Sequence, residues 1–128
     1  MKNFCFTHYD LDGAVSYLML RWAYGGSIPY KTTTAARFRE DFTQWLVSNN
    51  INDYDNIFIL DLDVADSQDL IDRNNVFIID HHLSHEQKAD YKKATAVVKV
   101  YDSAAKLSYK VFEKLYDENS IFSGFETL

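Results

Sequence analysis

The chain has few of the residues that interrupt regular structure or cross-link it. Its 128 residues include one proline, four glycines and a single cysteine, Cys5. A lone cysteine excludes an internal disulfide, so we expect a reducing, cytoplasmic setting. No apolar run approaches the ~20 residues of a membrane-spanning helix, so no membrane partner is expected. Because repeats and linkers are also lacking, we expect residues 1–128 to form one continuous domain.

Positive charge is scarce as well. The chain carries 13 Lys and Arg against 19 Asp and Glu, which gives a net charge of −6. This balance excludes the broad basic surface typical of direct nucleic-acid binders, but it allows a phosphate ligand held through metal ions. Asp outnumbers Glu 14 to 5, and Asp is typical of turns, helix caps and sites for hard metal ions. The positions of the aspartates therefore carry the functional information.

Short apolar runs alternate with helical patterns along the chain. Five strands are predicted at residues 3–7, 28–33, 56–60, 76–79 and 96–101. Helices are predicted at residues 14–24, 37–49, 66–73, 84–92 and 103–116. Such alternation is typical of right-handed βαβ units and a parallel sheet. We therefore predict an α/β three-layer sandwich, with a mostly parallel five-stranded sheet in the order 2-1-3-4-5 and helices on both faces.

Acidic and imidazole side chains follow three of the predicted strands directly. They are His8, Asp10 and Asp12 after the first strand, Asp61 after the third, and Asp80, His81 and His82 after the fourth. The carboxyl ends of parallel strands share one edge, where α/β proteins bind their ligands. Carboxylates crowded there repel one another unless divalent cations lie between them. Mixed imidazole and carboxylate ligands favour manganese, iron or zinc over calcium. The pattern predicts a metal site at this edge.

Two divalent ions at such a site would change the local electrostatics. They would bring the net charge of the protein from −6 to −2 and make the cleft locally positive. One carboxylate can bridge two ions ~3.5–4 Å apart, which is the arrangement used to hydrolyse phosphate esters. An acidic protein could bind a phosphate ligand in this way.

The three motifs resemble those of the DHH phosphoesterase superfamily. The segment from His8 to Gly13 resembles its HxDxDG motif, the apolar strand ending in Asp61 resembles its second motif, and Asp80-His81-His82 resembles its third. Residues 103–107 are similar to the start of the helix after the fifth strand. The two-residue spacing from His8 to Asp10 resembles the RecJ-type exonucleases, nano-RNases and cyclic-dinucleotide phosphodiesterases more than the family II pyrophosphatases.

The resemblance implies a function and a role for each motif residue. The implied activity is hydrolysis of phosphodiester bonds in short or single-stranded oligonucleotides or (cyclic) nucleotides by a two-metal hydroxide mechanism. The implied cofactors are two divalent ions, manganese above all. His8 and Asp10 would bind one ion, Asp12 and His81 the other, and Asp61 would bridge both. His82 would contact the scissile phosphate, and Asp80 would orient His81.

Two features of the superfamily are not recognisable in the sequence. One is a fourth motif, whose Asp completes the second metal site, and the other is a C-terminal substrate-binding domain. The chain is therefore expected to be either a truncated catalytic domain or a naturally short protein. A homodimer partner or a missing domain could supply what is absent. Without such a supplement, we expect weak binding of the second ion and low or no turnover.

Other interpretations remain open. Residues 57–64 resemble the nucleophile motif of haloacid-dehalogenase-type phosphatases, with Asp61 as the nucleophile. The domain could also bind a metal and a nucleotide or partner without catalysis. Three further residues receive non-catalytic predictions: Asp63 and Asp102 as capping residues, and His85 as an exposed residue at the start of a short helix.

Overall fold

A five-stranded parallel sheet forms the centre of the computed structural model, which describes residues 2–100 and 102–118. The strands are β1 (Asn3–His8), β2 (Tyr30–Thr33), β3 (Asn56–Leu60), β4 (Val76–Asp80) and β5 (Thr95–Val98). Their order is β2-β1-β3-β4-β5, and every pair of neighbours is parallel. The predicted strand order is confirmed, and the described strands form an entirely parallel sheet.

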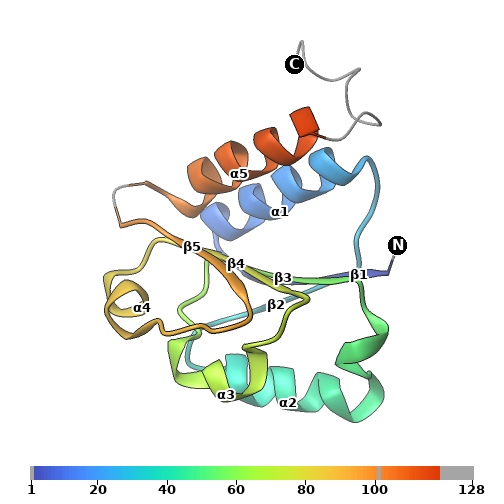
Figure 1. The fold of residues 1–128 in the computed structure, drawn as a ribbon, viewed down its shortest axis with the longest axis vertical. Coiled ribbons are helices and arrows are strands. Elements are labelled where there is room, and N and C mark those ends of the chain that lie inside the picture. Colours follow the sequence, from blue (N-terminus) through green and yellow to red (C-terminus); the bar gives the residue numbers. More distant parts are fainter. Residues whose placement is uncertain (1, 101, 119–128) are drawn as a thin grey trace.

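Helices cover both faces of this sheet. They are α1 (Leu11–Tyr24), α2 (Phe38–Ser48), α3 (Gln68–Ile71), α4 (Leu83–Lys88) and α5 (Ala104–Glu118), with the 3₁₀ turns η1 (Ile51–Asp53) and η2 (Ala65–Ser67). Helices α1 and α5 pack side by side on one face, whereas α2 and α3 lie on the other (Figure 1). The predicted three-layer sandwich is therefore confirmed.

The central strands are buried on both sides because alternate side chains enter two separate cores. Phe6, Ile57 and Ile59 pack with the aromatic side chains of α2, whereas Cys5 and Leu60 pack with α1 and α5. Burial on both faces explains why these strands are continuous apolar runs rather than alternating patterns. Burial also raises the pKa of the Cys5 thiol well above its ordinary value, so this cysteine is a structural residue.

Element boundaries differ from the predictions at two places that matter for the site. Helix α1 begins at Leu11 rather than at residue 14, because the Asp10 side chain caps it by accepting a hydrogen bond from the Gly13 amide. Strand β5 ends at Val98, and Tyr101, the predicted end, lies outside the described residues. Among the described helices, none has the length and apolar character needed to cross a membrane.

Candidate metal centre at the carboxyl edge of the sheet

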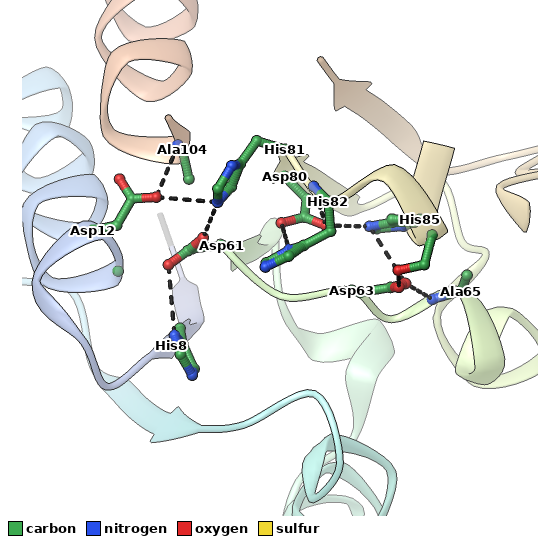
Figure 2. Close-up of polar contacts among 12 residues, drawn as sticks. His8, Asp12, Asp61, Asp63, Ala65, Asp80, His81, His82, His85 and Ala104 are labelled. Atoms are coloured by element: carbon green, nitrogen blue, oxygen red, sulfur yellow. Dashed lines mark hydrogen bonds and ion pairs between the residues drawn. The ribbon is translucent and has the colours of Figure 1, made fainter. Parts of the chain in front are cut away.

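The three motif segments meet because β1, β3 and β4 are neighbours in the sheet. Parallel strands leave the sheet at the same edge, so the segments that follow them lie side by side. Figure 2 shows Asp12, His81 and His8 around Asp61, with Asp80 and His82 on the adjoining side. Asp10 lies beside His8, with the His8 Nδ1 2.8 Å from the Asp10 Oδ2. The structure thus brings together all seven motif residues singled out in the sequence.

Asp61 occupies the middle of this cluster. It is the only non-glycine residue with a positive φ in the described chain, at 59°, a conformation that Asp and Asn adopt more readily than other residues. Its carboxylate is 2% exposed, with Oδ1 3.0 Å from the His81 Nε2. Its Oδ2 is buried without a hydrogen-bond partner, and the His8 Nδ1 lies 3.6 Å away. The backbone therefore holds a buried carboxylate between two imidazoles, with one oxygen unpaired.

The electrostatics of Asp61 indicate that a cation belongs beside it. Burial is the largest cause that raises its pKa to about 9, and the negative charges of Asp12, Asp10 and Asp80 raise it further. A divalent ion against the unpaired Oδ2 would offset this repulsion and keep the carboxylate ionised. The donor set, which combines carboxylates with imidazoles, fits manganese, iron or zinc. The residues present therefore fit the metal ions that the sequence predicts.

His8, Asp10 and Asp61 form the first group that could hold an ion. Each offers one ligand atom, and these atoms lie within 4.8 Å of one another. The Asp10 Oδ1 accepts a hydrogen bond of 2.9 Å from the Gly13 amide, which fixes the carboxylate at the start of α1. Partial burial raises the pKa of Asp10, but this hydrogen bond, together with the neighbouring Asp61 and His8, outweighs burial and holds that pKa below its usual value. Asp10 is therefore an ionised, pre-oriented ligand candidate.

Asp12 and His81 lie on the other side of Asp61. The His81 Nε2 is 3.3 Å from the Asp12 Oδ2 and 3.0 Å from the Asp61 Oδ1. Asp12 also accepts hydrogen bonds from the backbone amides of Ala104, at 3.0 Å, and Ala105, at 2.7 Å. These two amides belong to the first turn of α5, where orphan N–H groups attract an anion. Asp12 therefore joins the start of α1 to the start of α5 while facing the cluster.

The Asp80 carboxylate contacts the rings of His82 and His85, whereas the resemblance implies that it orients His81. Its fully buried carboxylate has Oδ1 2.7 Å from the His82 Nδ1 and Oδ2 2.8 Å from the His85 Nδ1. Burial raises the pKa of Asp80, but the hydrogen bond with His85 and the nearby His82 ring outweigh burial and keep the pKa below its usual value. Asp80 is thus an ionised anchor for two imidazoles. Its ligand atoms also lie within 4.8 Å of those of Asp61, His81 and His82.

His85 is a part of the site that the sequence analysis missed. The prediction of an exposed histidine is wrong, because His85 is fully buried between Asp80 and Tyr91. Its Nε2 lies 2.6 Å from the Tyr91 hydroxyl. The only signal in the sequence is that His85 follows His82 by three residues, which places it one helical turn along α4.

The other two predicted capping residues have different outcomes. Asp63 accepts a hydrogen bond of 3.1 Å from the Ala65 amide, which agrees with a capping role, and it also accepts one from the Ser84 hydroxyl. Asp102 does not cap α5, because the Ser103 hydroxyl accepts the hydrogen bond from the Lys106 amide instead. The side chain of Asp102 forms ion pairs with Lys106, at 3.2 Å, and Lys110, at 3.0 Å.

Replacing His85 with leucine is expected to destabilise the metal-free protein by about 2 kcal/mol. The substitution leaves the buried Asp80 Oδ2 without its closest donor, and an ionised buried group that loses a partner is costly. Urea unfolding in the presence of EDTA measures the change. Tyr91→Phe is the matched control, because it removes only the outer hydroxyl and should have a smaller effect. Equal stability of His85→Leu and the wild type would contradict this account of Asp80.

Comparison with known proteins agrees with this geometry. A search of curated proteins found no match to the chain. The model of the family described as "DHH family, N-terminal domain" matches residues 2–125, which is nearly the whole sequence. The chain therefore belongs to the DHH family of metal-dependent phosphoesterases and carries that family's N-terminal domain.

Proposed function

We propose that this domain hydrolyses phosphodiester bonds with the help of two divalent ions, manganese above all. The observation that carries the proposal is the position of Asp61, a buried carboxylate with one unpaired oxygen and an imidazole on each side. A carboxylate in that position is suited to bridge two ions. The substrates that we propose are short or single-stranded oligonucleotides or (cyclic) nucleotides.

The ligands divide into two sets that share Asp61. His8, Asp10 and Asp61 would hold one ion, and Asp12, Asp61 and His81 the other. When bound, such ions lower the pKa of a coordinated water towards neutrality and offset the negative charge of the phosphate. Bound cations are needed to attract the substrate, because the chain has a net charge of −6 and a phosphodiester is itself an anion.

His82 is placed to contact the phosphate. Its Nδ1 lies against the Asp80 carboxylate, so its Nε2 is the ring nitrogen that remains to face a substrate. The side chain is 45% exposed, which leaves it accessible to a substrate at the cluster. The Asp80 carboxylate fixes the orientation of the His82 ring, so that its outward nitrogen is already in place to contact a phosphate.

Manganese is expected to raise the melting temperature, and EDTA should reverse the increase. The reason is that the ions bind the folded state and relieve the repulsion around Asp61, whereas the unfolded chain lacks the site. Thermal melts with and without the metal measure the shift. An unchanged melting curve under both conditions would contradict the metal centre.

Hydrolysis is tested with the same protein and three substrates: a short end-labelled oligonucleotide, a cyclic dinucleotide and inorganic pyrophosphate. We expect manganese-dependent cleavage of a phosphodiester and slower or no cleavage of pyrophosphate. A manganese shift without cleavage of any substrate would favour the non-catalytic alternative. Trapping of beryllofluoride on Asp61 would instead favour the haloacid-dehalogenase-type chemistry, for which Asp61 is the nucleophile.

The second ion is expected to bind more weakly than the first. Each set offers three protein ligands, but Asp12 in the second set already shares its oxygens with two backbone amides of α5. We propose that a further domain or a second copy of the chain completes this side. Calorimetric titration with manganese should show a tight and a weak step, and two equal steps would contradict the proposal.

A further inference from the structure

A pocket of about 360 Å³ opens beside His8, between α1 and the edge formed by β1 and β2. Its volume is within the range of roughly 300–1,000 Å³ that is typical of small-molecule sites. We call it the tyrosine pocket, because Tyr9, Tyr17 and Tyr30 line it together with His8 and Arg21. His8 belongs both to this pocket and to the first group of candidate metal ligands. A molecule in the tyrosine pocket would therefore lie next to the metal centre.

The lining of the tyrosine pocket contrasts with the rest of this acidic protein. No Asp or Glu is among the described residues that line it, and Arg21 is the only Lys or Arg there. Arg21 forms no ion pair within the part of the chain that the structure describes. A hollow with an unpaired cation and no carboxylate suits an anionic ligand, even beside an acidic cluster.

Two of the three tyrosines that line the pocket are exposed. The rings of Tyr9 and Tyr30 are in side chains that are 68% and 56% exposed. Tyr17 is buried and supports Tyr30, because its hydroxyl donates a hydrogen bond to the Ile28 carbonyl and its ring centroid lies 4.6 Å from that of Tyr30. Exposed rings on a rigid support are the platform on which nucleobases stack.

The two ends of the tyrosine pocket differ in their chemistry. It extends along α1 from Ala14 to Arg21, which is about 10 Å at the helical rise of 1.5 Å per residue. His8 and the metal centre lie at the start of α1, and Arg21 lies in its last turn. An anion held by Arg21 is therefore separated from a phosphate at the metal centre by the space lined with tyrosines.

We infer that the tyrosine pocket binds the nucleoside next to the scissile phosphate. Its base stacks on Tyr30 or Tyr9, and Arg21 contacts a second phosphate on the far side of that nucleoside. This inference rests on the proposed function, because it takes the scissile phosphate to lie at the metal centre. It narrows the substrate to molecules with a base between two phosphates, such as a dinucleotide that carries a terminal phosphate.

Binding of a 5′-phosphorylated dinucleotide, its mononucleotide and inorganic phosphate tests the inference. Calorimetric titrations with the full chain, in EDTA and in manganese, do not depend on turnover. We expect the dinucleotide to bind tightest and phosphate weakest. Tyr30→Ala should weaken binding of both nucleotides about tenfold, and Tyr30→Phe should restore it, because stacking needs only the ring. Arg21→Ala should remove the advantage of the dinucleotide over the mononucleotide.

Two controls make the outcomes distinct. Tyr109→Ala removes another exposed tyrosine, 46% exposed on α5, which does not line the tyrosine pocket, and should leave binding unchanged. Tyr9→Ala provides a second test of stacking if Tyr30→Ala does not fold. If the Tyr30, Tyr9 and Arg21 variants bind the nucleotides as tightly as the wild type and keep the manganese shift, the inferred nucleoside site is wrong, whereas the proposed metal centre is not contradicted. Loss of the manganese shift in the wild type would overturn the proposed function itself.

Discussion

Replacing Asp61 with asparagine is expected to abolish the manganese-induced rise in melting temperature and to stabilise the metal-free protein. The amide keeps the size of the side chain and tolerates the φ of 59° at this position. It removes a buried carboxyl group whose ionisation is opposed by its surroundings and whose Oδ2 has no hydrogen-bond partner. A neutral amide is also a poor bridge between two cations. The substitution should therefore raise the stability of the metal-free protein and remove the stabilisation that manganese gives.

The gain in stability should depend on pH. In the folded protein the pKa of Asp61 is about 9, above its ordinary value of 3.8, so the folded state binds this proton more strongly than the unfolded state. The stability that this proton contributes is complete below the unfolded pKa and is lost as the pH rises through the folded pKa. The advantage of Asp61→Asn in EDTA should therefore grow from acid to neutral pH and beyond. At neutral pH we expect about 1–3 kcal/mol, which corresponds to several degrees in melting temperature.

Thermal melts at a pH near the unfolded pKa of Asp61 and at a pH near its folded pKa measure the pH-dependent gain in stability. The same melts in EDTA and in manganese measure the loss of the manganese shift. Asp66→Asn is the matched control, because the Asp66 side chain is 90% exposed and its ion pair with Lys88 is 3.7 Å long. It should change neither the stability nor the manganese shift. A manganese shift that survives in Asp61→Asn would show that Asp61 is not a ligand.

Gly13→Ala is expected to destabilise the protein by about 3 kcal/mol or more and to disrupt the metal centre. A Cβ on Gly13 would lie 2.0 Å from the carbonyl oxygen of His8, which is backbone and cannot rotate away. Two hydrogen bonds hold the segments together at this point, from the Thr7 hydroxyl to the Gly13 carbonyl and from the Gly13 amide to Asp10. Relief of the clash would have to separate α1 from β1, which also separates His8 from Asp10.

Urea unfolding compares this variant with Gly26→Ala. A Cβ on Gly26 would meet no atom within 4 Å, so that substitution should change the free energy of unfolding by no more than about 0.5 kcal/mol. Similar stabilities of the two variants would contradict the close approach of Gly13 to His8. If Gly13→Ala folds, its manganese shift should still be smaller than that of the wild type.

The architecture could be predicted because local patterns and a general rule sufficed. Apolar runs such as residues 57–60 indicate buried strands by composition alone, and the right-handed crossover limits how such strands connect. Once β1, β3 and β4 are neighbours, the residues that follow them must share an edge. The convergence of His8, Asp61 and His81 therefore follows from their positions directly after strands.

The remaining details depend on contacts that no local pattern encodes. His85 is buried because α4 turns it towards Asp80 and Tyr91, whereas a short polar helix on its own is typical of an exposed segment. The second role of Asp12 involves amides that lie 92 and 93 residues further along the chain. Sequence reasoning identified the residue types of the site, and the tertiary structure decides which carboxylate orients which imidazole.

The contact between Asp12 and α5 has a consequence for biosynthesis. All three motifs leave the ribosome before Ala104 and Ala105, because they lie within the first 82 residues. A nascent chain of that length has every candidate ligand but lacks the amides that orient Asp12. One half of the candidate centre uses only segments that leave the ribosome early, whereas the other half is aligned only when α5 docks. Vectorial synthesis thus delays completion of the candidate metal centre until α5 is in place.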